Sequence, residues 1–273
     1  MLTFLFWNLN GKDLVPAIAR LVAVHEVDVL VLAEFTGEQI TPMLLALNPE
    51  EQAAQFHYAP SECDRIAIFT RFPSDFIKPI VENSRYTIRK LTLSTCEEIL
   101  FVAAHLLSLL NASAETLDIE AMRLAQEIRV RETEAGHSRT IVVGDLNMNP
   151  FSSGVVSANG LHGVMTQNIA RKGSRIVQGR EYPFFFNPMW GHLGDKGNTP
   201  AGTYYYRKSD HVCYFWNTFD QVLIRPDLLD YWDEEFLQIL TTDGQQSFLT
   251  SNSSTPNSRN FSDHLPLLFR LSL

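Results

Sequence analysis

Residues 2–34 read LTFLFWNLNGKDLVPAIARLVAVHEVDVLVLAE, a stretch in which two short apolar runs enclose one amphipathic segment. The runs, residues 2–7 and 27–33, have the length and composition of buried strands. The segment between them, residues 13–25, has apolar side chains at helical spacing, namely Leu14, Ile18, Leu21 and Val22. A strand–helix–strand unit of this kind builds buried sheets with helices on their faces, so the stretch predicts an α/β fold.

The same kinds of element continue along the chain. Further helices are predicted at residues 37–47 and 117–134, and further strands at residues 65–69, 86–93, 99–104, 140–143, 218–224 and 265–271. Residues 151–215 differ from the rest because they are rich in glycine, proline and aromatic residues. We interpret them as a loop-rich insertion with short elements, and long ordered loops are often functional. No repeat or linker divides the chain, so residues 1–273 are predicted to form a single domain.

Composition limits the classes of function. Apolar residues make up 45% and charged residues 19% of the 273, as in ordinary globular proteins. The formal net charge of −9 argues against a broad basic surface for polyanions. It leaves a nucleic-acid substrate open, because bound cations can neutralise phosphate inside an acidic pocket.

Cysteine content and the apolar segments bear on location. Cys63, Cys96 and Cys213 show no ligand spacing, which argues against a disulfide framework or a structural zinc site. The amino-terminal residues lack the basic region of a signal peptide. The longest apolar stretch, residues 21–35, is interrupted by charged residues and cannot cross a bilayer. We therefore expect a cytoplasmic protein without membrane contact or an obligate protein partner.

Polar residues lie within or at the ends of the predicted strands, where α/β proteins collect their chemistry. They are Asn8, Glu34, His105, Asp145, Asn147, Asp220 and His264. Each has an ordinary structural explanation when taken alone. Asn8 could cap a helix, Glu34 could mark the surface end of a strand, and His105 could be a hydrogen-bonded core histidine.

Two of these positions stand in longer polar motifs. In residues 144–150, GDLNMNP, Asp145 and Asn147 are two apart and can point the same way from an extended segment, although this composition also favours a turn. In residues 262–266, SDHLP, Asp263 and His264 precede the last predicted strand. An Asp–His contact is often only structural, so neither motif decides the function by itself.

Taken in order, these motifs resemble those of the endonuclease/exonuclease/phosphatase superfamily, the deoxyribonuclease I-like group. The resemblance extends from about residue 3 to residue 271, and six motifs in the expected order carry it. They are residues 7–11 (WNLNG), Glu34, His105, residues 144–147 (GDLN), residues 219–222 (FDQV) and residues 262–266 (SDHLP). The resemblance implies a four-layer α/β sandwich, in which two packed mixed sheets are flanked by helices and the site lies at one rim.

The resemblance also implies a metal-dependent phosphodiesterase. Glu34 would be the principal ligand of a divalent ion, with Asp263, Asn8 and Asn10 near it. Oxygen ligands of this kind suit Mg²⁺ or Mn²⁺, and such an ion stabilises the charge that develops on phosphate.

The same resemblance gives the remaining polar residues catalytic roles. His264 would contact the scissile phosphate as a general base or as a cation, and Asp220 would orient its ring. Asp145 would orient or deprotonate the attacking water, while Asn147 and His105 would donate hydrogen bonds to phosphate.

The branch and the substrate depend on less specific signals. Phe35-Thr36 and His105 replace residues typical of the abasic-site endonucleases, which argues against that branch. Basic and aromatic residues occur together within residues 171–190 and 204–208, a combination found in proteins that bind nucleic acid, although it also fits aromatics packed beneath solvated loops. We therefore favour a nuclease acting on DNA or RNA. A hydrolase of a small phosphorylated molecule, such as a nucleotide or an inositol phosphate, and a catalytically silent binding protein are the alternatives.

Overall fold

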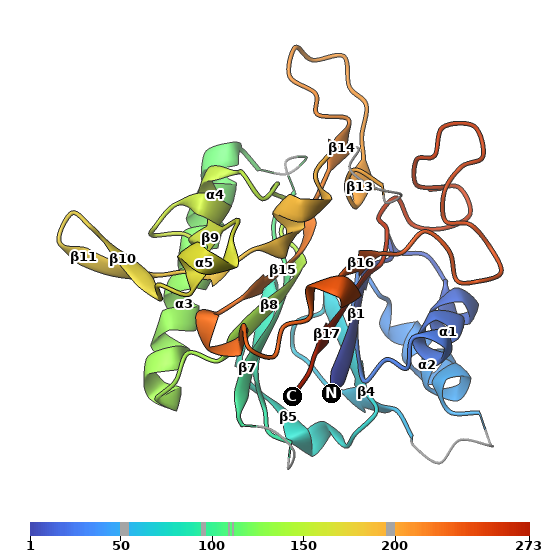
Figure 1. Cartoon of the computed structure of the whole chain (residues 1–273). Coiled ribbons are helices and arrows are strands. Elements are labelled where there is room, and N and C mark those ends of the chain that lie inside the picture. Colours follow the sequence, from blue (N-terminus) through green and yellow to red (C-terminus); the bar gives the residue numbers. More distant parts are fainter. Residues whose placement is uncertain (50–54, 94–96, 109, 111, 195–199) are drawn as a thin grey trace.

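Two mixed β-sheets form the centre of the molecule (Figure 1). The computed structural model describes residues 1–49, 55–93, 97–108, 110, 112–194 and 200–273. The first sheet has the order β16-β17-β1-β2-β4-β3. Its strands are β1 (Leu2–Asn8), β2 (Val29–Ala33), β3 (His57–Ala59), β4 (Ile66–Thr70), β16 (Gln238–Ile239) and β17 (Leu267–Leu271).

The second sheet has the order β5-β6-β7-β8-β15-β12-β9. Its strands are β5 (Ile77–Glu82), β6 (Tyr86–Leu91), β7 (Ile99–His105), β8 (Thr140–Asp145), β9 (Gly163–Val164), β12 (Phe185–Phe186) and β15 (Asp220–Ile224). The predicted strands are therefore present, with small shifts at their ends. Strands β3, β5, β9, β12 and β16 were not predicted; most are short, and β5 is largely exposed.

The pairing of the central strands brings the polar strand ends to one rim. Strand β1 is parallel to β2 and antiparallel to β17, while β7 is parallel to β8, which is antiparallel to β15. The carboxyl ends of β1, β2, β7 and β8 therefore lie at the same rim as the amino ends of β15 and β17. In this register Asp145 is the partner of both His105 and Asp220 on its neighbouring strands.

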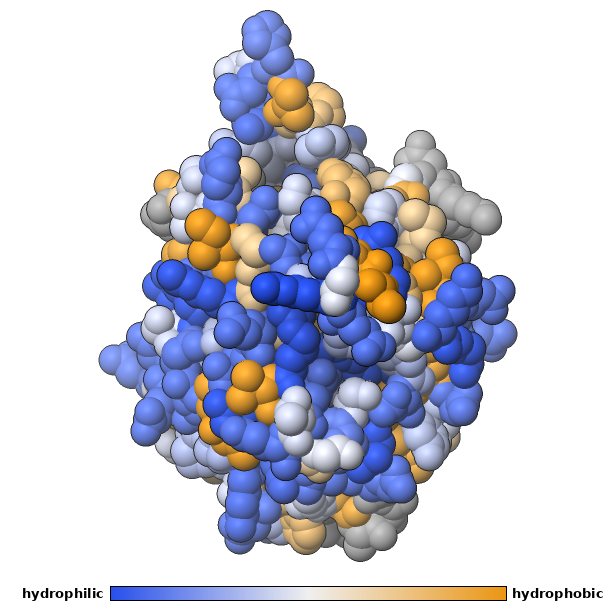
Figure 2. All heavy atoms as spheres, turned by 90° about the vertical axis from the view of Figure 1, so that its left-hand side faces the viewer, coloured by the Kyte–Doolittle hydropathy of each residue, from blue (hydrophilic) through white to orange (hydrophobic). Residues whose placement is uncertain are grey.

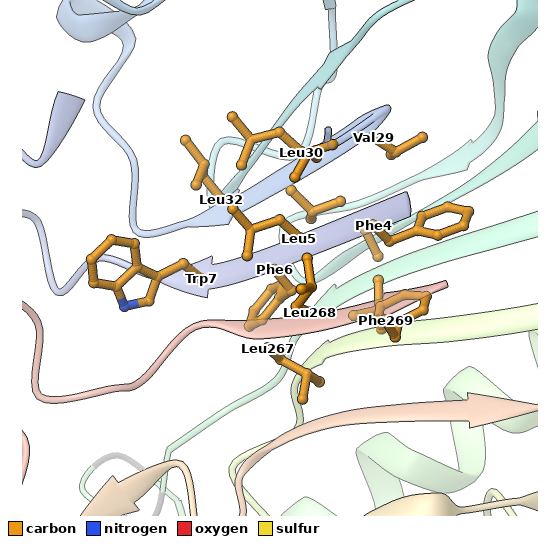
Figure 3. Packing of buried hydrophobic residues seen from close by; sticks show 14 of the residues in the cluster. Phe4, Leu5, Phe6, Trp7, Val29, Leu30, Leu32, Leu267, Leu268 and Phe269 are labelled. Carbon is orange, nitrogen blue, oxygen red and sulfur yellow. The ribbon is translucent and has the colours of Figure 1, made fainter. Parts of the chain in front are cut away.

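Aromatic and aliphatic side chains join the two sheets into one core. Figure 3 shows Phe4 beside Phe269, and the ring centroids are 4.9 Å apart in a stacked arrangement. Phe4 also stacks on Phe101 of the second sheet at 5.7 Å. Truncation of a buried phenylalanine such as Phe4 to alanine is expected to destabilise the fold by about 3–5 kcal/mol. The sheets consequently form a rigid base for the rim.

Helices cover the outer faces and complete the four layers that the family resemblance implies. Helices α1 (Val15–Val24) and α2 (Ile40–Leu47) pack beside the first sheet, whereas α3 (Ala114–Ala135) covers the second (Figure 1). Helix α3 begins at Ser113, whose hydroxyl accepts a hydrogen bond from the Thr116 amide, and it ends at Gly136 in the left-handed region with a φ of 73°. The face that α3 occupies is mostly hydrophilic, as Figure 2 shows.

Residues 151–215 contain short elements connected by loops. They include α4 (Ser153–Val156), α5 (Gln167–Ala170) and the hairpin of β10 (Ser174–Val177) and β11 (Arg180–Pro183). A second hairpin pairs β13 (Tyr204–Tyr205) with β14 (Trp216–Asn217), and its loop stands out from the body (Figure 1). Residues 195–199 and Cys96 lie outside the described residues. None of the helices in the described ranges is long and apolar enough to cross a membrane.

Candidate active site

His264 and Asp220 form a buried pair at the rim. His264 Nδ1 lies 2.8 Å from Asp220 Oδ2, and their side chains are 8% and 0% exposed. Asp220 is the first residue of β15, and the loop before β17 delivers His264, whose carbonyl accepts a hydrogen bond from the Trp7 indole at 2.9 Å. The pair therefore has a fixed geometry in which the other ring nitrogen, Nε2, faces the rest of the rim.

Asp145 is the centre of the constellation. Its Oδ2 accepts a hydrogen bond from Asn8 Nδ2 at 2.9 Å and lies 3.7 Å and 3.8 Å from the Nε2 atoms of His105 and His264. Its Oδ1 accepts from the Asn147 amide at 2.8 Å. The rim thus places one carboxylate between two imidazoles.

Glycine precedes Asp145 for a steric reason. A Cβ atom at Gly144 would collide with the carbonyl oxygen of Ala104 on β7. Since Ala104 precedes His105, the close approach of the two strands keeps Asp145 beside that histidine. The small residue of the GDLN motif is required by this strand contact.

Glu34 is the accessible carboxylate of the rim. Its side chain is 36% exposed, and its Oε1 lies 3.5 Å from His105 Nε2. The backbone at Glu34 is left-handed, with a φ of 53°, and Asn147 has a φ of 52°. Non-glycine residues adopt this region at an energetic cost of roughly 1–3 kcal/mol, and such residues gather at functional sites. The strained backbone turns both residues out of the regular strand path.

Asn8, Asn10 and Asp263 lie around Glu34 and Asp145 with unequal exposure. Asn8 is buried and uses its Oδ1 to accept a hydrogen bond from the Asn10 amide at 3.0 Å. The Asn10 side chain is exposed and makes no described hydrogen bond. Asp263 is half-buried and lies close enough to Glu34 for its charge to contribute to the raised pKa of that carboxyl. Of the four metal-ligand candidates, the structure leaves only Asn10 at the edge of the group.

Burial and charge set the titration of these groups. Burial raises the pKa of Glu34, and the charges of Asp145 and Asp263 add to this, against the opposing effect of His264. For His264, burial acts to lower the pKa, but the charges of Asp220 and Asp145 outweigh it and raise the pKa to about 10. The imidazole therefore keeps its proton at neutral pH in the metal-free protein.

Two buried polar atoms at the rim lack partners among the described residues. They are His105 Nδ1 and Asp220 Oδ1. Buried polar atoms are nearly always hydrogen-bonded, so such atoms indicate positions for water or ligand. Asn147, in contrast, donates from its side-chain nitrogen to the Leu106 carbonyl at 3.1 Å and thereby holds the turn after β8.

The donor groups of the rim fit a divalent cation. Asp145, Asp220 and His264 offer ligand atoms that all lie within 4.8 Å of one another. Two of those atoms, however, already share the 2.8 Å hydrogen bond between His264 and Asp220. The accessible carboxylates Glu34 and Asp263 make a second oxygen-rich group that suits a hard cation.

Tyr204 is a rim residue that the sequence indicated only as part of a basic and aromatic group. Its ring centroid lies 4.7 Å from that of His264, and it stacks on Phe219 at 5.3 Å and on Tyr206 at 6.4 Å. Burial, with the charge of Asp263, raises the pKa of Tyr204 to about 12, so its hydroxyl stays neutral. An aromatic row therefore leads from the catalytic histidine candidate to the exposed ring of Tyr206.

The other basic and aromatic segment lies elsewhere. The β10–β11 hairpin extends from the flank beside α3 and α5 (Figure 1). Arg175 of this hairpin donates to His162 at 2.9 Å, and Arg171 pairs with Asp230 at 2.7 Å. Of the two segments, only the one containing β13 contacts the rim residues.

Comparison with known proteins agrees with the fold. The chain matches the Endonuclease/Exonuclease/phosphatase family over residues 5–264 and belongs to that family. Members of this family depend on divalent metal and generally hydrolyse phosphoric esters. None of the curated proteins matches the chain at a significant level.

Several solved structures share the architecture at low sequence identity. Truncated TDP2 from Caenorhabditis elegans is 16% identical, with a TM-score of 0.56 over 98% of this chain and 97% of that one. D. rerio TDP2 complexed with a single-strand DNA product is 16% identical, with a TM-score of 0.52 over the same shares. A family protein from Leptotrichia buccalis is 13% identical, with a TM-score of 0.54 over 100% of both chains. At these identities the likeness establishes the fold.

Proposed function

We propose that this protein is a Mg²⁺- or Mn²⁺-dependent nuclease that hydrolyses phosphodiester bonds of DNA or RNA. The observation that carries the proposal is the buried His264–Asp220 pair, held at 2.8 Å, beside the accessible carboxylate of Glu34. This arrangement combines a fixed imidazole with an open oxygen-rich position. Family membership supports hydrolysis of a phosphoric ester by this rim.

Glu34 and Asp263 are the proposed metal ligands. Both are at least partly exposed, so a hydrated ion can reach them, and both offer the oxygen atoms that Mg²⁺ prefers. Asn8 is oriented by Asp145 and by the Asn10 amide, which assigns Asn10 an indirect role through its backbone. A bound divalent cation stabilises negative charge on phosphate and lowers the pKa of water.

The remaining residues act on phosphate and on water. Asp220 fixes His264 through Nδ1, which leaves Nε2 free to donate to a phosphate oxygen. Asp145 lies between the two imidazoles and is the acceptor for a proton of the attacking water. His105 donates a hydrogen bond to a phosphate oxygen. The side-chain amide of Asn147 does the same with the proton that does not bond to the Leu106 carbonyl.

Nucleic acid is the proposed substrate because of the aromatic row that starts at His264. Tyr206 has an exposed ring on which a base can stack, and Tyr204 connects this ring to His264. Stacking of this kind contributes roughly 1–3 kcal/mol per base. The loop between β13 and β14 carries further exposed apolar residues, Val212, Tyr214 and Phe215. Figure 2 shows this part of the chain projecting from the body, mostly hydrophilic with a small apolar area on it. The structure of D. rerio TDP2 with a single-strand DNA product lends support from a protein of the same fold.

The test is a hydrolysis assay on plasmid DNA, single-stranded DNA, RNA and bis(p-nitrophenyl) phosphate, with Mg²⁺, with Mn²⁺ and with chelator. We expect metal-dependent cleavage of at least one nucleic acid. The His264→Ala variant is expected to lose roughly 10²–10⁴-fold in kcat while it still binds substrate. Turnover of small phosphoesters alone would establish the alternative substrate class, and no turnover of any substrate would indicate a silent binding protein. The cytoplasmic location and the absence of an obligate partner stay predictions.

A further inference from the structure

We infer that Arg65 and Arg85 form a two-armed clamp for a phosphate next to the scissile one, so that the enzyme selects polynucleotides over isolated phosphodiesters. This inference rests on the proposed nucleic-acid substrate and names a subsite for it. Neither arginine belongs to the motifs that carry the family resemblance.

Each arginine is the backbone neighbour of a rim residue on the adjacent strand. The Glu34 amide donates to the Arg65 carbonyl at 3.1 Å, and the His105 amide donates to the Arg85 carbonyl at 2.8 Å. Arg65 directly precedes β4 and Arg85 directly precedes β6, so one arginine comes from each sheet. Because Glu34 Oε1 and His105 Nε2 are only 3.5 Å apart, the two arginines flank a single point of the rim.

The strand order places both arginines on the same flank. Strand β4 lies beyond β2 when counted from β1, and β6 lies beyond β7 when counted from β8. Neighbouring strands are about 4.8 Å apart, so each guanidinium starts one strand farther out than the rim residue beside it. The scissile phosphate would be held at the centre of the rim by His264 and His105, so the arginines are placed to hold the next one.

The opposite flank carries the aromatic row. Tyr204 forms a bridge to His264, and Thr203 accepts a hydrogen bond from the Asp220 amide, which ties the β13–β14 hairpin to the side of β15 and β17. A strand of nucleic acid across the rim would therefore meet stacking rings on one side and guanidinium groups on the other. A substrate with one phosphate and no bases would contact neither the stacking rings nor the guanidinium groups.

Both guanidinium groups are available for a ligand. Arg65 is exposed and Arg85 is half-buried, and neither makes an ion pair with a carboxylate of the described residues. Glu34 is the backbone neighbour of Arg65, yet no ion pair joins their side chains among the described residues. Arginine binds phosphate through paired N–H donors, which suits it to this position.

The experiment compares Arg65→Gln, Arg85→Gln and the double variant with Arg180→Gln, which removes an equal charge from the exposed β10–β11 hairpin. Steady-state kinetics with Mg²⁺ are measured on a single-stranded oligodeoxynucleotide and on bis(p-nitrophenyl) phosphate. Each rim variant is expected to lower kcat/KM for the oligonucleotide about 10-fold, mainly through KM, because a charge-assisted hydrogen bond to phosphate is lost. The ratio of the two kcat/KM values should fall by the same factor, and Arg180→Gln should leave it unchanged.

Two further measurements sharpen the result. The slope of log KM against log salt should decrease by about 0.7 for each arginine removed, the contribution of one phosphate contact on single strands. A neutral methylphosphonate can replace the phosphate on either side of the cleaved bond, one oligonucleotide for each side. For the side that the arginines hold, kcat/KM of the wild type should fall about 10-fold, whereas kcat/KM of the double variant should change little.

Different results would overturn different claims. If wild type cleaves the oligonucleotide and both rim variants keep its KM and salt slope, the clamp is wrong while the nuclease stands. Equal losses on both substrates would also overturn the clamp, since the arginines would then position the rim itself. If wild type cleaves only bis(p-nitrophenyl) phosphate, the nuclease proposal fails and the clamp fails with it.

Discussion

The two sheets contribute different halves of the active-site rim. Glu34, at the end of β2 in the first sheet, has a side chain that is 36% exposed, whereas Asp220, at the start of β15 in the second, is fully buried. Both are carboxylates at the end of an apolar strand. The first is open to a ligand that exchanges with solvent, and the second is already engaged with an imidazole. We therefore propose that the rim has a metal-binding half around Glu34 and a half around Asp220 that fixes proton positions.

Replacement of Asp220 should give the largest effect. The Asp220→Asn variant keeps the size of the side chain but removes the charge that holds His264 at 2.8 Å. We expect kcat to fall roughly 10²–10⁴-fold, with the Mg²⁺ concentration for half-maximal activity unchanged. A metal titration of the variant checks this, and a large shift in the midpoint would place Asp220 in the metal-binding half.

In the metal-free protein, the loss of stability caused by Asp220→Asn should depend on pH. The pKa of His264 is raised from 6.5 to about 10, so its charged form stabilises the fold fully below pH 6.5, and this contribution is lost as the pH rises towards 10. Asp220 is the largest charge that raises this pKa. The difference in unfolding free energy between wild type and Asp220→Asn should therefore shrink between pH 6.5 and pH 10, as urea denaturation would measure.

Replacement of Glu34 should act on the metal. In Glu34→Gln, the accessible carboxylate loses its charge while the His264–Asp220 pair stays intact. The Mg²⁺ concentration for half-maximal activity should rise by at least about 10–100-fold, the range that even indirect partners of metal ligands produce. Activity should return at high Mn²⁺. An unchanged metal titration would remove Glu34 from the metal-binding half and would favour the buried group of Asp145, Asp220 and His264.

Replacement of Tyr204 should give the smallest effect, because this residue belongs to neither half. In Tyr204→Ala the ring that packs against His264 is lost, and KM for single-stranded DNA should rise about 5–100-fold. Tyr204→Phe keeps the ring face and should stay near wild type, since the hydroxyl is neutral and makes no described hydrogen bond. If Tyr204→Ala lowers kcat on bis(p-nitrophenyl) phosphate as strongly as on DNA, the tyrosine positions His264 and does not bind bases.

The sequence was a good guide to the strands and to the residues at their ends. A run of apolar residues that stops at a polar one is a local pattern, so Glu34, His105 and Asp145 could be found without knowledge of the fold. Their mutual geometry could not be found in this way. The hydrogen bond between Asn8 and Asp145 joins residues 137 positions apart, and it depends on how one sheet packs on the other.

Composition also failed to separate the two aromatic and basic segments. Residues 171–182 and 204–208 look alike in sequence, but in the first segment Arg175 donates to His162 and Arg171 pairs with Asp230. The bridge between Tyr204 and His264 and the hydrogen bond from the Asp220 amide to Thr203 bring the second segment to the rim. Arg65 and Arg85 were missed because each directly precedes a strand and lies outside the six motifs. The pairing of β4 with β2 and of β6 with β7 shows their position.

The pairing of β1 with β17 has a consequence for the order of folding. The Trp7 indole and the Asn8 carbonyl hydrogen-bond to His264 and Ser262, contacts that span 257 and 254 positions of sequence. Contacts of such separation form late, because the chain must first close a very long loop. A partly folded chain can have most of both sheets formed while the His264 imidazole is not yet in its place at the rim. Hydrolytic activity should therefore arise only in the final cooperative step, and a refolding experiment should recover it no earlier than the complete tertiary structure.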